Sequence, residues 1–177
     1  MDRECGVLLP CDGRRLAWRR WVGNAFRVPD AEVPSIPHLG HIHLRVRDLD
    51  RAVQFYTAVF GLAVTEREGR YAFLSFGDHH HDVALQSVPP DAPGPGGGVG
   101  LYHAAVELDD LDALAALADR LTDREVAVSP VDHGISKALY FDDPSGNGLE
   151  AYVDTRDAPA DRWAGTNRPF RLSDAAP

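Results

Sequence analysis

The sequence predicts an α+β fold built from two βαβββ modules, and three observations lead to this prediction. Residues 41–50 (HIHLRVRDLD) and 103–112 (HAAVELDDLD) form an internal repeat, with apolar residues at matching positions and the same Asp-Leu-Asp ending. Each copy continues into an amphipathic segment that starts at an aspartate, as a capped helix does, and then into three strand-like segments. A Pro- and Gly-rich linker, residues 89–99, separates the copies. The paired modules are expected to form a cupped mixed sheet around a shared cavity, with the helices outside.

The first module, residues 38–88, begins with the strand that carries the first repeat. Its helix is expected from about Asp50 to Phe60, where Gly61 provides a stop signal. Three further strands are then expected near residues 62–68, 71–77 and 81–88.

The second module, residues 100–154, repeats this order. Its helix is expected from about Asp112 to Leu121, and its later strands near residues 126–131, 137–141 and 149–153. The last two strands flank the sequence DDPSGNG (residues 142–148), which is typical of a turn. The chain is therefore expected to divide into an N-terminal arm (1–36), one domain of paired modules (37–155) and a C-terminal tail (156–177).

Length and composition are typical of one folded domain. The 177 residues are 44% hydrophobic and 25% charged. The net charge of -9 argues against nucleic-acid or anionic-membrane binding, because acidic groups outnumber the basic groups that would neutralise phosphates. No apolar run has membrane-spanning length and the acidic start is not typical of a signal peptide, so we expect a cytoplasmic protein. The only cysteines, Cys5 and Cys11, do not predict a disulfide framework.

Both ends of the chain carry aromatic residues outside the modules. The N-terminal arm is rich in Arg and Trp between Arg14 and Trp21. It is expected either to pack across the domain or a dimer seam, or to help close the mouth of a pocket. Trp163 and Phe170 in the tail indicate that this segment docks onto the domain.

Histidines occupy equivalent positions in the first strand of each module. Because side chains alternate along a strand, His41 and His103 are expected to face the cavity while the apolar residues beside them face the helix. Glu150 stands inside an otherwise apolar strand, where a carboxylate is costly unless a cation meets it. Two imidazoles and a carboxylate are the ligands of the facial triad that binds non-haem Fe(II). Isolated strand histidines are usually core residues, but equivalent repeat positions together with an inward carboxylate favour a metal site.

Three segments carry a resemblance to a known family. The sequence DLDRAVQFYTAVFGL (residues 48–62) resembles the vicinal oxygen chelate superfamily, which also includes glyoxalases and bleomycin resistance proteins. Within that superfamily, HHDVAL (80–85) and HG…LYFDDPSGNGLEAY (133–152) resemble the type I extradiol dioxygenases, notably catechol 2,3-dioxygenases. The resemblance covers roughly residues 38–155. Many such enzymes carry two pairs of modules, whereas this chain has one.

The resemblance implies an oxidoreductase that inserts both atoms of O2 into a catechol or substituted catechol and yields a muconic semialdehyde-type product. It implies Fe(II), or Mn(II), as the cofactor, held by His41, His103 and Glu150. It also implies groups that act on protons, with His81 near dioxygen, Tyr140 at a substrate oxygen and His133 at the rim. The expected partners are a small-molecule catechol, O2 and a second copy of the chain in a homodimer, with no nucleic acid and no membrane.

Four more residues are predicted to contact the substrate: Arg45, His43, Val83 and Leu85. By alternation Val83 and Leu85 share a face with His81, where they would form an apolar wall for an aromatic ring. Arg45 would bind a carboxylate on the substrate, unless it forms an ion pair with Glu107 at the equivalent repeat position. Simpler interpretations stay open for the proton-handling residues, with Tyr140 as a core residue and His133 in a loop without a role.

Other activities share this fold. A glyoxalase-like metal-dependent isomerase or lyase normally has an acidic ligand on the last strand of the first module, where this chain reads Val83-Ala84-Leu85-Gln86. A thiol transferase acting on an antibiotic would use three ligands but gives no reason for the HDVAL segment. A metal-free drug-binding resistance protein would not need two histidines and a glutamate together. The extradiol dioxygenase is therefore the preferred prediction.

Overall fold

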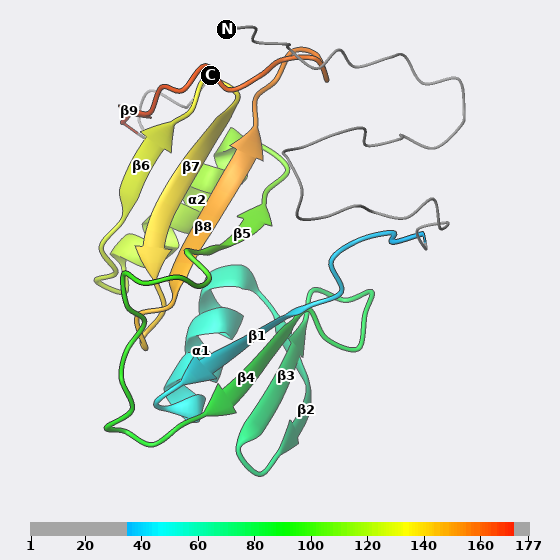
Figure 1. Cartoon of the computed structure of the whole chain (residues 1–177), viewed down its shortest axis with the longest axis vertical. Helices are drawn as coiled ribbons and strands as arrows, with labels where there is room; N and C mark the ends of the chain where they lie inside the picture. The colour runs from blue at the N-terminus through cyan, green and yellow to red at the C-terminus, as the bar shows by residue number, and fades with distance from the viewer. Residues whose placement is uncertain (1–34, 172–177) are drawn as a thin grey trace, which may run out of the picture. The chain divides into compact units, whose positions relative to one another are not determined.

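Each repeat forms one module with the predicted βαβββ order (Figure 1). The computed structural model describes residues 35–171, and the predictions for the Arg- and Trp-rich arm and for the cysteines lie outside this range. The first module consists of β1 (Ile42–Val46), α1 (Leu49–Phe60), β2 (Ala63–Glu68), β3 (Tyr71–Ser75) and β4 (Val83–Ser87). The second module and the tail contain β5 (Ala104–Glu107), α2 (Leu111–Thr122), β6 (Ser129–Asp132), β7 (Ser136–Asp142), β8 (Gly148–Asp154) and β9 (Arg168–Pro169).

The repeated Asp-Leu-Asp sequence starts both helices. The Asp48 carboxylate accepts a hydrogen bond from the Arg51 N–H at 3.0 Å, and Asp110 accepts from the Ala113 N–H at 2.8 Å. At the other end of α1, Gly61 adopts a left-handed conformation (φ 74°), which ends the helix as its sequence predicts. Both helices are confirmed, although each begins one residue before the expected position and α2 ends one residue later than expected, at Thr122. Neither of them is long and apolar enough to cross a membrane.

The strands form a separate mixed sheet in each module. The four-stranded sheet has the order β1-β4-β3-β2, and the five-stranded sheet has the order β5-β8-β7-β6-β9. In each module the first strand runs parallel to the last one, β1 with β4 and β5 with β8, while the remaining pairs are antiparallel. The first strand therefore lies at an edge of its sheet in both modules. The short β9, which pairs with β6, was not expected from the sequence.

Side chains from both modules pack into one hydrophobic core. In β1, Leu44 and Val46 are buried while His43 and Arg45 are exposed, which confirms the alternation expected for this strand. The core includes fully buried residues from both helices and both sheets, among them Val59, Leu74, Leu85, Leu114, Leu121 and Leu139. Such close packing fixes the strands on which the candidate functional residues stand.

Candidate functional site

Close packing between β5 and β8 brings His103 beside Glu150. These strands are parallel neighbours, with Ala105 opposite Glu150 and His103 directly before β5. A Cβ atom on Gly148 would lie 2.6 Å from the Tyr102 carbonyl oxygen, so only glycine permits this approach of the two backbones. The result is a contact of 2.8 Å between His103 Nε2 and Glu150 Oε2, with Glu150 only 9% exposed.

A chain of hydrogen bonds continues from Glu150 through Tyr140 to His133. Tyr140 and Glu150 are directly opposite each other on β7 and β8, and the Tyr140 hydroxyl donates to Glu150 Oε1 at 2.9 Å. His133 Nε2 lies 2.9 Å from the same hydroxyl, and His133 Nδ1 lies 2.7 Å from Asn167 Oδ1. Burial, followed by the hydrogen bond to Glu150, raises the pKa of Tyr140 above its usual value. The phenol therefore keeps its proton at neutral pH, between a carboxylate and an imidazole.

His41 and His81 form a separate cluster on the first module. Their ring centroids are 4.5 Å apart, and His81 Nδ1 also lies 2.9 Å from His80 Nδ1. Partial burial, followed by the neighbouring rings of His41 and His80, lowers the pKa of His81. A neutral imidazole at pH 7 is able to accept a proton, which is the property a general base needs.

Asp82 positions the loop that carries His81, a role that sequence reasoning missed. Its carboxylate accepts from the Phe76 N–H at 2.8 Å and from the Ser75 hydroxyl at 3.1 Å. Burial alone would raise the pKa of Asp82, but these hydrogen bonds, with one from His79, lower it overall. The available signal was an acid placed directly before a strand, in the sequence HHHDVAL.

One cavity of about 370 Å³ is shared by the two predicted metal histidines. His41 and His103 both line it, together with apolar residues of α1 such as Tyr56 and Phe60. Within the part of the chain that the structure describes, no group of three His, Cys, Asp or Glu side chains is close enough to hold a metal ion. The structure places two of the predicted ligands, His103 and Glu150, side by side. The third predicted ligand, His41, lies beside His81 instead.

The pair of His103 and Glu150 is suited to a divalent metal. Two donors that share an octahedral ion at about 2.1 Å lie about 3 Å apart, and these two are separated by 2.8 Å. His103 Nδ1 is buried without a hydrogen-bond partner among the described residues, so Nε2 is the ring nitrogen that faces the carboxylate. Metal binding requires a neutral imidazole and an ionised carboxylate, and this pair supplies both ligand types.

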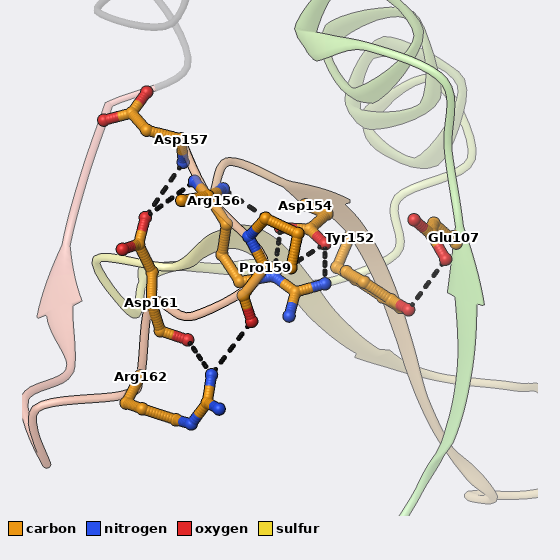
Figure 2. Close-up of polar contacts among 9 residues, drawn as sticks. Glu107, Tyr152, Asp154, Arg156, Asp157, Pro159, Asp161 and Arg162 are labelled. Carbon is orange, nitrogen blue, oxygen red and sulfur yellow. Dashed lines mark hydrogen bonds and ion pairs between the residues drawn. The ribbon is translucent and has the colours of Figure 1, made fainter. Parts of the chain in front are cut away.

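The residues predicted to contact substrate lie in two environments. His43 and Arg45 are exposed on β1. Val83 is buried and also lines the cavity, whereas Leu85 is fully buried in the core and does not line it. No salt bridge joins Arg45 to Glu107 within residues 35–171. Glu107 instead accepts a hydrogen bond from the Tyr152 hydroxyl at 3.1 Å (Figure 2).

Polar contacts fix the start of the C-terminal tail beyond β8 (Figure 2). Arg156 Nε donates to both oxygens of Asp154 at 3.0 and 2.9 Å, and this hydrogen bonding lowers the pKa of Asp154 to about 2. Further along, the Asp161 carboxylate accepts from the Asp157 N–H at 3.1 Å. Arg162 donates to the Pro159 carbonyl at 2.9 Å. The tail is thus held in place as it leads towards Asn167.

A buried carboxylate in the turn between β7 and β8 links the two modules. Asp143 accepts from the N–H groups of Ser145 and Asn147, from the Asn147 side chain and from the Tyr56 hydroxyl of α1 at 3.2 Å. Burial, followed by the charge of Asp143, raises the pKa of Tyr56. Arg47, just after β1, donates to the Ser145 carbonyl at 2.9 Å. The DDPSGNG sequence therefore holds the modules together as well as forming a turn.

Residues 38–151 match the Glyoxalase/Bleomycin resistance protein/Dioxygenase superfamily. The chain belongs to this superfamily. A catechol-2,3-dioxygenase of Bacillus subtilis is 36% identical over 127 residues, which are 71% of this chain and 44% of that protein. A biphenyl-2,3-diol 1,2-dioxygenase of Rhodococcus globerulus is 28% identical over 137 residues, 76% of this chain and 72% of that protein. This chain thus spans less than half the length of the Bacillus relative.

Superfamily relatives with other names match at similar identity. They include a glutathione transferase FosA of Serratia marcescens and a probable lactoylglutathione lyase of Vibrio parahaemolyticus, each 30% identical. Among solved structures, a glyoxalase/bleomycin resistance protein/dioxygenase from Nocardioides has a TM-score of 0.57, with 23% identity over 73% of this chain and 91% of that one. The structural likeness establishes the fold. Members of the superfamily include dioxygenases and lyases, and superfamily members use divalent metal ions.

Proposed function

We propose that this chain is an extradiol ring-cleaving dioxygenase that acts on catechol or a substituted catechol. The observation that carries the proposal is the hydrogen-bonded chain from His133 through Tyr140 to Glu150, which ends beside His103. Ring cleavage requires a catechol to lose protons as it binds and a proton to move as the ring is attacked. An imidazole and a phenol within hydrogen-bond distance at a metal-binding pair meet this need. The similarity to the Bacillus catechol-2,3-dioxygenase supports the same assignment.

Each side chain has a definite task in this proposal. His41, His103 and Glu150 would hold Fe(II), and the bound metal would supply a binding point for catechol and O2 and a path for electrons between them. Tyr140 donates a hydrogen bond to the substrate oxygen, and His133 accepts a proton through it. His81, whose lowered pKa keeps it neutral, accepts and returns a proton on the side of the first module.

A lactoylglutathione lyase activity is the second candidate, because relatives with this name match at 30% identity. An isomerase of this kind normally takes a fourth, acidic ligand from the last strand of the first module. In this chain β4 reads VALQS and carries no acid. Nor does a lyase explain why His133 and Tyr140 are joined to Glu150.

We also propose that the working form is a homodimer. The described part of the chain leaves β1 and β5, the strands next to His41 and His103, each with a single neighbouring strand. The segment that leads into β5 exposes large apolar side chains, with Leu101 69% and Tyr102 87% exposed. Unpaired strand edges and exposed apolar residues are features that a second copy can cover. Such a dimer would allow His41 of one copy to meet Glu150 of the partner subunit.

The proposed activity is tested with protein purified without oxygen, loaded with Fe(II) and mixed with substituted catechols in air. We expect O2 uptake and a yellow ring-cleavage product. The variants His41→Ala, His103→Ala and Glu150→Ala are expected to lose bound iron but keep the circular dichroism of the fold, while the control His79→Ala keeps both. Retention of stoichiometric iron by all three variants would refute the ligand assignment. Conversion of a glutathione hemithioacetal, without any catechol cleavage, would favour the lyase.

Mixing inactive variants tests whether the site is shared between copies. His41→Ala and Glu150→Ala each remove one ligand from every site. If the ligands come from two subunits, a mixed dimer contains one site with all three ligands and regains activity. If they come from one subunit, the mixture stays inactive. Sedimentation velocity on the wild-type protein reports the oligomeric state directly.

A further inference from the structure

The sheet of the first module carries a row of polar side chains across three of its strands. Strand β4 lies between β1 and β3 (Figure 1), and Arg45, Gln86 and Tyr71 are paired across these strands. Paired residues point to the same side of a sheet. The residues that precede two of them, Leu44 and Leu85, point to the other side and are buried in the core. This polar row therefore lies on the face that is turned away from the core.

Arg70, in the turn before β3, completes the polar row. Its guanidinium lies over the Tyr71 ring, 5.4 Å from the centroid, and its Nε and Nη2 lie 3.4 and 3.3 Å from the Tyr71 hydroxyl. The Gln86 amide is satisfied when its oxygen faces this pair, where it accepts from the Tyr71 hydroxyl at 3.2 Å and from Arg70 Nε at 3.3 Å. In this orientation the NH2 group of Gln86, which is a donor, points away from both residues.

The two arginines of the polar row lack an acidic partner in the described range. Neither Arg45 nor Arg70 forms a salt bridge within residues 35–171, although the whole chain has a net charge of -9. Glu68, which is paired with Tyr71 on β2, forms none in this range either. A guanidinium presents several N–H donors in a geometry that matches a carboxylate. Two guanidinium groups beside an amide NH2 are therefore complementary to an anion.

A second row, made of aromatic rings, lies between the polar row and His81. His43 and Phe73 are both paired with Ala84 and so share the face of the polar row. The ring of Phe73 is 5.0 Å from that of His81, and the ring of His43 is 6.2 Å from that of Tyr71. Two residues along a strand span about 7 Å, which is the spacing between the two rows. An aromatic ligand over the second row would thus reach the polar row through a short side chain.

We propose that the polar row binds the carboxylate of the substrate, and that the preferred substrate is a catechol whose acid group stands on a short side chain. Arg70, Gln86 and Tyr71 act together with Arg45 as specificity-determining residues and leave the dihydroxy end of the ring to the histidines. This inference rests on the proposed function for the catechol, whereas the anion site itself requires only an aromatic acid.

Binding is measured by titration calorimetry on Fe(II)-loaded protein without oxygen, so that no turnover occurs. The probes are a catechol that carries a propionate side chain and its methyl ester, which keeps the shape but lacks the charge. We expect the wild type to bind the acid roughly tenfold more tightly, as one charge-assisted hydrogen bond predicts, and the preference to shrink as salt is added.

Two variants locate the preference within the polar row. Gln86→Glu keeps the shape of the side chain but places a carboxylate beside the arginines, so it is expected to abolish the preference for the acid. Arg70→Met is expected to reduce the preference several-fold, because it removes one of the two charges. Both variants should keep the affinity for the ester and the circular dichroism of the fold. Arg51→Met on α1 is the charge-matched control and should bind both probes as the wild type does.

The outcomes separate this inference from the proposed function. Equal affinity of the wild type for acid and ester, or binding of neither, overturns the inference, as does a preference that Gln86→Glu and Arg70→Met leave unchanged. Cleavage of both compounds in air with equal kcat/KM upholds the dioxygenase and removes the anion site. A preference for the acid that depends on Gln86 and Arg70, in a protein that cleaves neither compound, refutes the proposed function and leaves the anion site in place.

Discussion

The two modules share one βαβββ plan and one helix-start sequence, yet they carry different polar chemistry. In the second module, Glu150, Tyr140 and His133 are joined by hydrogen bonds across neighbouring strands. In the first module, His81 lies in the loop before β4 and contacts other histidine rings, His41 and His80. A regular strand pair thus organises one half of the candidate site, and a loop organises the other.

The difference shows how two copies of one fold unit contribute different chemical groups to one candidate site. Strand register gives the second module a rigid array in which a carboxylate, a phenol and an imidazole are each held by their neighbours. In the first module a loop does this instead, and Asp82 holds that loop by accepting from the Ser75 hydroxyl and the Phe76 N–H. A metal that joins His41 to the pair of His103 and Glu150 would connect a loop-based cluster with a strand-based one.

The largest effect is expected from removing His81, the proposed proton-handling residue in the loop of the first module. His81→Ala should keep bound iron and bind catechol but lose about 10²–10⁴-fold in kcat, the usual contribution of a general acid or base. The matched control His38→Ala removes an exposed histidine that precedes β1 and should retain most activity. Single-turnover product formation with iron-loaded protein is the measurement. Normal kinetics in His81→Ala would assign the whole proton chemistry to the second module.

The next largest effect is expected from removing Asp143, whose carboxylate joins the two modules. Asp143→Ala removes the acceptor for the buried Tyr56 hydroxyl and for the N–H groups of Ser145 and Asn147. Unsatisfied buried donors are costly, so we expect the free energy of unfolding to fall by about 3 kcal/mol. The control Asp142→Ala changes the exposed acid beside it and should cost little. Urea denaturation gives both values, and equal stabilities for the two variants would mean that this carboxylate does not join the modules.

Local signals in the sequence predicted much of this architecture. Both helices and the alternation in β1 follow from short-range patterns, and the pairing of Tyr140 with Glu150 follows from the turn between two strands. The position of Asn167 depends instead on a two-residue strand that pairs with a partner far away in the chain. The acceptor role of Asp143 for Tyr56 spans the two modules. Contacts of this kind depend on tertiary packing, which no short-range pattern encodes.

A smaller effect is expected from replacing Arg45. This replacement tests substrate binding separately from the chemical step. Its side chain is exposed on β1 and forms no salt bridge among the described residues. If it binds a carboxylate on the catechol ring, Arg45→Met should raise KM for that acid roughly tenfold, as the loss of one charged hydrogen bond predicts, and leave unsubstituted catechol unaffected. Arg51→Met on α1 is the charge-matched control. Equal changes for both substrates would show that Arg45 has a structural role.

The smallest effect concerns the anchor of the tail, for which the first module has no counterpart among the described residues. The hydrogen bonds from Arg156 lower the pKa of Asp154 from 3.8 to about 2. A carboxyl group whose pKa is lower in the folded state stabilises that state above pH 3.8, and this contribution is lost as the pH falls through about 2. The pair is exposed, so the contribution is small and salt screens it further. Asp154→Asn should therefore be slightly less stable than the wild type at neutral pH in low salt, and the difference should shrink as the pH falls towards 2 and as salt is added. Urea denaturation across this pH range is the measurement, and a difference that persists at pH 2 would mean that Asp154 stabilises the tail through something other than its charge.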